Sequence, residues 1–88
     1  MRTVTIMFTD VEGSTRWWET EPDHMSAALQ VHDHVVREVV AEFGGEIFAT
    51  GGDGFAVCFD EAAPAVSAAL SVQSRLAATD WPGPVRLA

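Results

Sequence analysis

The sequence predicts a single α+β domain, in which one antiparallel sheet carries helices on one of its faces. Short runs of apolar and β-branched residues, typical of strands, occur at residues 3–8, 46–50 and 55–59. Two longer stretches, residues 24–43 and 65–76, instead repeat apolar residues at helical spacing. With 88 residues, the chain forms one domain at most.

The first predicted strand, residues 3–8, contains few polar residues, which favours a buried central strand over a half-exposed edge strand. Residues 11–19 follow it and are expected to form a turn and a short helix. We expect Trp17 and Trp18 to pack in the core or at a dimer interface. Arg16 is expected to remain solvated, the alternative being a contact with a phosphate group.

A long helix is predicted next. Thr20 or Glu21 lies near its cap, and Pro22 falls in its first turn, where a proline is tolerated. Apolar residues then recur at helical spacing over residues 25–43, and His32 lies on the same face. The two glycines that follow are a usual helix end.

The predicted strands at residues 46–50 and 55–59 are joined by a glycine-rich connection that contains Asp53, which favours a hairpin. Asp60 is then expected to cap a second helix. The apolar stripe of that helix, residues 65–76, is rich in alanine and suits close packing on a sheet.

After a rigid turn at residues 81–84, residues 85–88 resemble the opening of another strand. The element order is therefore strand, helix, strand, strand, helix and a truncated last strand. This is the split βαβ, ferredoxin-like order, with an antiparallel sheet and both helices on one face. An unfinished sheet leaves an open edge and uncovered apolar surface, so we expect the chain to associate when expressed alone.

The composition disfavours several classes of protein. Thirteen acidic residues stand against five arginines and no lysine, giving a net charge of −8, which disfavours a nucleic-acid binder. An acidic protein that binds a nucleoside triphosphate needs metal ions or a few well-placed arginines. No apolar run is long enough to span a membrane, and the start shows no secretory signal. The single cysteine, Cys58, is expected to be buried and unreactive and fits a reducing, cytoplasmic location.

The motif with the clearest chemistry is residues 8–15. Asp10 ends an apolar strand and can bind a divalent cation, while the small residues after it can turn amides and hydroxyls toward phosphate oxygens. If the strands are neighbours, Asp10 and Asp53 could share a pair of ions. The alternatives are that Asp10 caps the short helix and that Asp53 is an ordinary hairpin acid.

Residues 8–15 and 48–55, taken together, resemble class III nucleotide cyclases, the adenylyl and guanylyl cyclase catalytic domain. Both blocks stand at the family's spacing, and the second has its Gly-Asp-Gly hairpin. The resemblance covers essentially residues 1–88, which correspond to the N-terminal half of the family's domain. It implies that two Mg²⁺ or Mn²⁺ ions are held by Asp10, the carbonyl of Val11 and Asp53. It also implies that the triphosphate is wrapped by Glu12, Gly13, Ser14 and Thr15.

The resemblance further implies conversion of ATP, with GTP as the alternative substrate, to a 3′,5′-cyclic nucleotide and pyrophosphate by two-metal catalysis in a homodimer, for intracellular signalling. Ala49 stands where many adenylyl cyclases of the family have a purine-selecting lysine, so the base is not readable from the motif. The family's transition-state asparagine and arginine fall beyond Ala88. We therefore expect that the 88 residues alone do not catalyse.

Two other functions fit parts of the pattern. A catalytically inactive cyclase-like module could dimerise or sense nucleotide, a role for which Ala49 is slightly better suited. Another two-metal phosphoryl-transfer enzyme, such as a diguanylate cyclase or a polymerase-palm relative, would share the strand-end acid and the hairpin. His24, His32 and His34 are expected to be core or surface residues, because they lack partners at zinc-site spacing.

Overall fold

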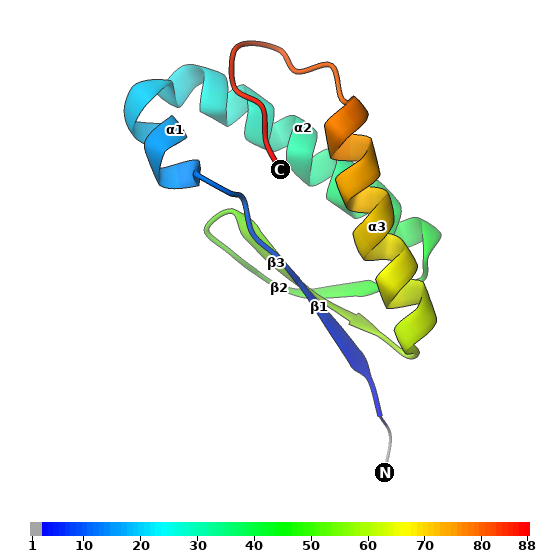
Figure 1. The fold of residues 1–88 in the computed structure, drawn as a ribbon. Coiled ribbons are helices and arrows are strands. Elements are labelled where there is room, and N and C mark those ends of the chain that lie inside the picture. The colour runs from blue at the N-terminus through cyan, green and yellow to red at the C-terminus, as the bar shows by residue number, and fades with distance from the viewer. Residues whose placement is uncertain (1–2) are drawn as a thin grey trace.

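The computed structural model describes residues 3–88, and its three strands form one antiparallel sheet in the order β1-β3-β2 (Figure 1). The strands are β1 (Thr5–Thr9), β2 (Glu46–Gly51) and β3 (Gly54–Phe59). The helices are α1 (Ser14–Thr20), α2 (Pro22–Glu42) and α3 (Ala62–Ala78). The antiparallel sheet with helices confirms the predicted α+β fold class.

The helix ends follow local chemistry. At the start of α2, Glu21 is the N-cap residue and Pro22 is the first helical residue, as predicted. At its end, Gly44 has a φ of 74°, and the N–H groups of Gly44 and Gly45 donate to the carbonyls of Ala41 and Val40. This is the Schellman arrangement, and it turns the chain sharply into β2.

The predicted cap of the last helix was wrong by one residue. The N-cap position of α3 is Glu61, not Asp60, and no side-chain hydrogen bond caps it. The extended backbone of Glu61 starts the helix without such a bond, so α3 depends on packing for its position. Its alanine-rich stripe provides that packing: Ala65, Ala68, Val72 and Leu76 are buried.

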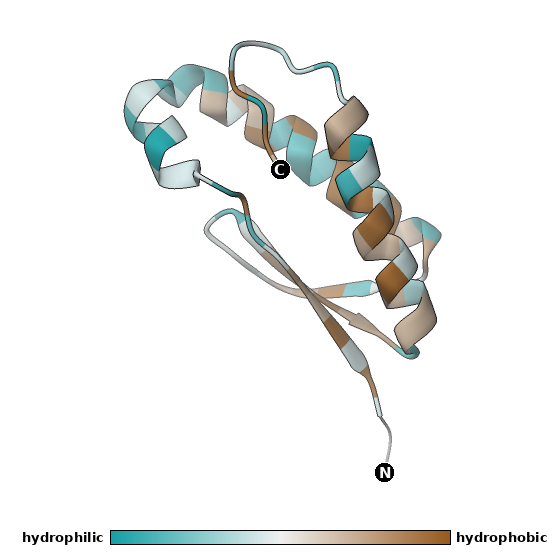
Figure 2. Cartoon of the chain, viewed as in Figure 1, coloured by the Kyte–Doolittle hydropathy of each residue, from teal (hydrophilic) through white to brown (hydrophobic). Residues whose placement is uncertain are grey.

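The main core lies between the sheet and the helices α2 and α3. From the sheet it takes Met7, Val57 and Phe59, and from the helices it takes the inner faces of α2 and α3. Figure 2 shows brown, apolar residues along α3 and the strands, whereas α1 and the beginning of α2 are mostly teal. Both long helices therefore cover one face of the sheet, in agreement with the expected layering.

The opposite side of the sheet, called here the bare face, consists of the outward-pointing residues of the strands. It includes Ile6 and Phe8 of β1, Phe48 and Ala49 of β2, and Ala56 and Cys58 of β3. Phe8 is 77% exposed and Phe48 is 56% exposed. The expectation of a buried central strand at residues 3–8 was wrong, because β1 pairs with β3 alone among the described strands and no helix covers Ile6 and Phe8. Cys58 is only half-buried, contrary to the expectation of a buried cysteine, because neither long helix reaches this face.

The predicted strand at residues 85–88 is not formed within the part of the chain that the structure describes. These residues nevertheless alternate as a strand would: Val85 and Leu87 are buried, and Arg86 and Ala88 are exposed. The buried pair belongs to a second, smaller core with Val11, Met25 and Ala28. The segment lies along the turn after β1 rather than along β1 itself, so it adds no strand to the sheet.

None of the helices in residues 3–88 combines the length and the apolar composition that a membrane-spanning segment requires.

Candidate functional site

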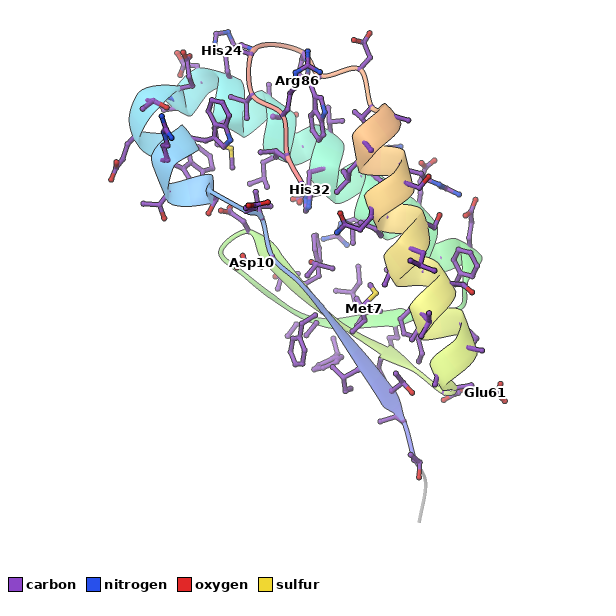
Figure 3. The ribbon with its side chains drawn as sticks, viewed as in Figure 1. Met7, Asp10, His24, His32, Glu61 and Arg86 are labelled. Atoms are coloured by element: carbon purple, nitrogen blue, oxygen red, sulfur yellow. The ribbon has the colours of Figure 1, made fainter. Side chains whose placement is uncertain are left out.

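Asp10 stands where β1 leaves the sheet (Figure 3). Its side chain is exposed, and its Oδ1 atom accepts a hydrogen bond of 3.0 Å from the backbone N–H of Val11. The N-cap residue of α1 is Gly13, with a φ of 70°, so Asp10 does not cap that helix. Val11 is buried in the second core and anchors the backbone beside the carboxylate.

The predicted phosphate turn, Glu12 to Thr15, leads directly into α1. The N–H of Glu12 is already engaged with the carbonyl of Ala88 at 3.1 Å. Within residues 3–88, no hydrogen bond occupies the backbone N–H groups of Gly13, Ser14 and Thr15. These three groups are the donors that the turn can offer to an anion.

Asp53 occupies the turn of the β2–β3 hairpin, between the paired residues Gly51 and Gly54. The hairpin was predicted, and the structure confirms it. Gly52 has a φ of 55°, a conformation that glycine adopts without strain and that a two-residue hairpin turn commonly needs. Asp53 is half-buried in this turn.

The hairpin pairs with the end of β1 and packs closely against it. Thr9 pairs with Phe55 in the ladder, and the N–H of Phe55 donates to Oγ1 of Thr9 at 3.0 Å. A Cβ atom on Gly54 would stand 2.4 Å from the carbonyl oxygen of Thr9, so only glycine lets the backbones approach this closely. The two sequence motifs are therefore neighbours, as the site prediction required.

The two carboxylates nevertheless line different cavities. Asp10 borders a cavity of about 360 Å³ at the bare face, together with Phe8, Ala49 and backbone of the hairpin. It also borders one of about 270 Å³ between β1 and the helices α2 and α3. Asp53 borders a third cavity, of about 180 Å³, with Asp33 and Arg37 of α2. The backbone therefore brings Asp10 and Asp53 to the same end of the sheet, but the two carboxylates do not border a common cavity.

The donors present suit Mg²⁺ or Mn²⁺ in chemical type, since hard ions of this kind prefer carboxylate and carbonyl oxygens. No group of three or more acidic, histidine or cysteine side chains gathers within the described residues. That Asp10, Asp53 and the carbonyl of Val11 share a metal ion stays a prediction, since the two carboxylates line different cavities.

Three further polar residues lie near the site; the sequence analysis considered His32 but not Asp33 or Arg37. His32 was expected on the apolar face of its helix, and it is buried, 1% exposed. Its Nδ1 atom lies 3.0 Å from Oδ1 of the neighbouring Asp33. The guanidinium carbon of Arg37 lies 5.2 Å from the centre of the Phe55 ring. The spacing of Asp33 and Arg37, four residues apart, places both on one helix face and is the sequence signal for them.

The other residues considered from the sequence lie away from these acids. His24 and His34 are exposed, with Nδ1 of His24 lying 2.9 Å from Glu21 and Nε2 of His34 lying 3.5 Å from Glu38. Trp17 packs against the second core, as expected, whereas Trp18 is partly exposed. Arg16 is exposed on α1.

Known sequences match this chain over most of its length. The family profile of the adenylate and guanylate cyclase catalytic domain matches residues 1–78. An adenylate cyclase from Lachancea kluyveri is 40% identical over 79 residues, which are 90% of this chain and 4% of that protein. The receptor-type adenylate cyclase B from Leishmania donovani is 40% identical over 78 residues, or 89% of this chain and 6% of that protein. The chain thus spans a small part of these relatives.

Solved structures agree. An adenylate cyclase from Trypanosoma brucei, solved in its monomeric state, superposes with a TM-score of 0.88 and 32% identity over 91% of this chain and 34% of that chain. A bacterial light-regulated adenylyl cyclase gives a TM-score of 0.78 at 18% identity, over 86% of this chain and 43% of that chain, and so supports the fold alone. With its strand-end acid and its Gly-Asp-Gly hairpin joined in one sheet, this chain belongs to the adenylate and guanylate cyclase catalytic domain family.

Proposed function

We propose that residues 1–88 supply the metal- and triphosphate-binding half of a nucleotide cyclase domain. In a dimer, or with a complementing second half, that domain converts ATP, with GTP as the alternative substrate, to a 3′,5′-cyclic nucleotide and pyrophosphate in the cytoplasm. The observation that carries the proposal is the junction of β1 with the hairpin, where the N–H of Phe55 donates to Oγ1 of Thr9. This junction puts Asp10 and Asp53 at the same end of the sheet.

The chain's own groups divide the work of binding. Asp10, Asp53 and the Val11 carbonyl would hold two Mg²⁺ or Mn²⁺ ions. Such ions, when bound, lower the pKa of a ribose hydroxyl and offset charge on the leaving pyrophosphate. The free N–H groups of Gly13, Ser14 and Thr15, where α1 begins, would orient the phosphates. With a net charge of −8, the protein depends on metal ions to attract a polyanion.

Turnover is a separate matter from binding. The resemblance assigns no residue of this stretch to transition-state stabilisation, and positioned charges of that kind contribute much of the rate in phosphoryl transfer. We therefore expect the 88 residues to bind metal and nucleotide weakly and to produce no cyclic nucleotide. Formation of cyclic AMP by the purified chain with ATP and Mn²⁺ would contradict this expectation.

Binding is tested by calorimetric titration of Mn²⁺, with a non-hydrolysable ATP analogue, into the chain and into Asp10→Ala and Asp53→Ala variants. We expect saturable binding that both substitutions abolish. Asp80→Ala is the matched control, because it removes one exposed carboxylate from the segment after α3 and changes the net charge equally. Asp80 borders none of the cavities that Asp10 and Asp53 line. Binding that survives in Asp10→Ala, or none at all in the folded parent chain, would refute a preformed half-site.

A regulatory role is the second candidate, and the bare face supports it. Phe8 and Phe48 are large apolar side chains exposed to solvent on the same side of the sheet, an arrangement typical of association surfaces. On this proposal the chain dimerises or senses nucleotide without turnover. If the chain binds nucleotide and the Asp10→Ala substitution leaves its affinity for Mn²⁺ unchanged, the regulatory role is favoured over the catalytic half-site.

A further inference from the structure

Arg37 of α2 contacts the hairpin at the residue that follows its turn. The guanidinium carbon lies 5.2 Å from the centroid of the Phe55 ring, within the distance of a cation–π contact. Phe55 is itself buried and pairs with Thr9 on one side and Thr50 on the other. The contact therefore joins α2 to a residue of β3 that lies beside the hairpin turn and pairs with both neighbouring strands.

Arg37 also borders the cavity of about 180 Å³ that Asp53 lines. The remaining walls of this cavity come from Asp33 and from the backbone around Gly52 and Gly54. The cavity thus spans the space between α2 and the hairpin turn. Arg37 lines this space and contacts Phe55 across it, so it joins the helix to the hairpin beside the turn.

No ion pair within residues 3–88 includes Arg37. Asp33, one helical turn earlier, could have been its partner, but Oδ1 of Asp33 lies 3.0 Å from Nδ1 of the buried His32. The other long cationic side chain on this side of the fold, Arg75, pairs with Glu42. The ring of Phe55 is therefore the described partner of the Arg37 guanidinium.

We propose that Arg37 is a positioning residue for Asp53. Stacked on Phe55, the guanidinium holds the β2–β3 turn at a fixed distance from α2 and so fixes the direction of the Asp53 carboxylate. The contact of Asp33 with His32 engages the carboxylate that neighbours Arg37 on the same wall of the cavity, and leaves Arg37 free to stack. The proposal rests on the proposed function in so far as Asp53 is a metal ligand.

Positioning and simple electrostatics predict opposite results at this residue. A guanidinium near a metal-binding carboxylate repels the cation, so removing its charge would, by charge alone, tighten Mn²⁺ binding. Removing a positioning contact instead loosens the turn and weakens binding. Arg37→Met keeps most of the length and removes the charge, whereas Arg37→Lys keeps the charge and a weaker cation–π contact.

The experiment measures two quantities on the parent chain, Arg37→Met and Arg37→Lys. The first is amide hydrogen exchange of residues 52–55, followed by NMR, and the second is the affinity for Mn²⁺ alone. We expect Arg37→Met to accelerate exchange of these amides about fivefold and to weaken Mn²⁺ binding about fivefold, as the loss of about 1 kcal/mol would. Arg37→Lys should restore part of both. The melting temperature of Arg37→Met should fall by about 4–8 °C, the shift that a loss of about 1 kcal/mol produces in a domain of this size.

The matched control is Arg86→Met, which removes an exposed arginine from the C-terminal segment and should change neither quantity. Unchanged exchange of residues 52–55 in Arg37→Met, or Mn²⁺ binding that is equal or tighter, would overturn the positioning role. If the parent chain binds no Mn²⁺, the proposed half-site fails, and exchange alone decides the role of Arg37. Accelerated exchange then supports it, and unaccelerated exchange overturns it.

Discussion

The two faces of the sheet differ in what covers them rather than in what they are made of. On the covered face, Val57 and Phe59 pack under α2 and α3 and are almost completely buried. On the bare face, Ile6, Phe8 and Phe48 are just as apolar and stand in solvent. An antiparallel sheet with one solvated face normally alternates apolar and polar residues. In β1, by contrast, the buried Met7 stands between the exposed apolar residues Ile6 and Phe8.

This difference separates the two tasks of the chain. The covered face holds the fold together, because burial of apolar area is the main favourable term in folding. The bare face contributes little to that core, so its apolar residues are better explained by another layer or a partner. The cavity of about 360 Å³ that Asp10 borders opens on this same face. A partner that covers the bare face would therefore also adjoin the candidate site.

The sharpest test of this comparison exchanges one phenylalanine on each face for alanine. Phe59→Ala should lower the free energy of unfolding by about 3–5 kcal/mol, because it removes a fully buried ring and leaves a cavity. Phe48→Ala should change it by no more than about 0.5 kcal/mol, as surface substitutions usually do. Urea denaturation followed by circular dichroism gives both values.

Self-association should be reduced more by Phe48→Ala than by Phe59→Ala, because Phe48 is exposed and Phe59 is buried. Phe48→Ala reduces the exposed apolar area of the bare face and should lower the sedimentation coefficient at high protein concentration. Equal destabilisation by the two substitutions would mean that the bare face is buried in the folded protein, and the distinction between the faces would fail.

A second test concerns the close contact between the end of β1 and the β2–β3 hairpin. Gly54→Ala puts a Cβ atom 2.4 Å from the carbonyl oxygen of Thr9 and should force β1 and the hairpin apart. We expect a loss of about 1–3 kcal/mol, the usual cost of overpacking a tight contact. Weaker Mn²⁺ binding should accompany it, because Asp10 and Asp53 separate.

Gly51→Ala is the matched control. Gly51 pairs with Gly54 in the same hairpin, has no positive φ, and has nothing within 4 Å of a Cβ atom. The same chemical change there should leave stability and metal affinity nearly unchanged. If Gly51→Ala costs as much as Gly54→Ala, the cause is the flexibility of the hairpin and not the close approach to β1.

Much of the fold could be predicted because local patterns determine it. The glycine pair that ends α2, the proline that begins it and the Asp-Gly turn each have a local physical cause, and each is found in place. Residues 85–88 were harder, because their alternating pattern fits a strand while their position depends on the second core. Asp60 was misassigned because an acid before a helix resembles a cap even where the helix begins one residue later.

The candidate site was predictable in its backbone and less so in its side chains. The hairpin follows from its glycine-rich turn, whereas the pairing of Thr9 with Phe55 joins distant parts of the chain and was only a condition of the site prediction. The separate cavities of Asp10 and Asp53 could not be predicted, since they depend on side-chain directions that periodicity leaves open. The sequence did not predict a role for Arg37 and Asp33, for a related reason. Their role comes from packing between α2 and the hairpin, elements that meet only in three dimensions.

The smallest expected effect lies within the helical layer of the covered face. Arg75 of α3 pairs with Glu42 at the end of α2, and both side chains are substantially exposed. Exposed ion pairs typically contribute about 0.2–1 kcal/mol and are screened by salt. Because α3 is held by its buried alanine, valine and leucine stripe, Arg75→Ala should lower stability by less than about 1 kcal/mol. A double-mutant cycle with Glu42→Ala, in 50 mM and 500 mM salt, isolates the pair. A coupling energy well above that range at high salt would show that the layer depends on this ion pair, and that the covered face is held by more than its apolar contacts.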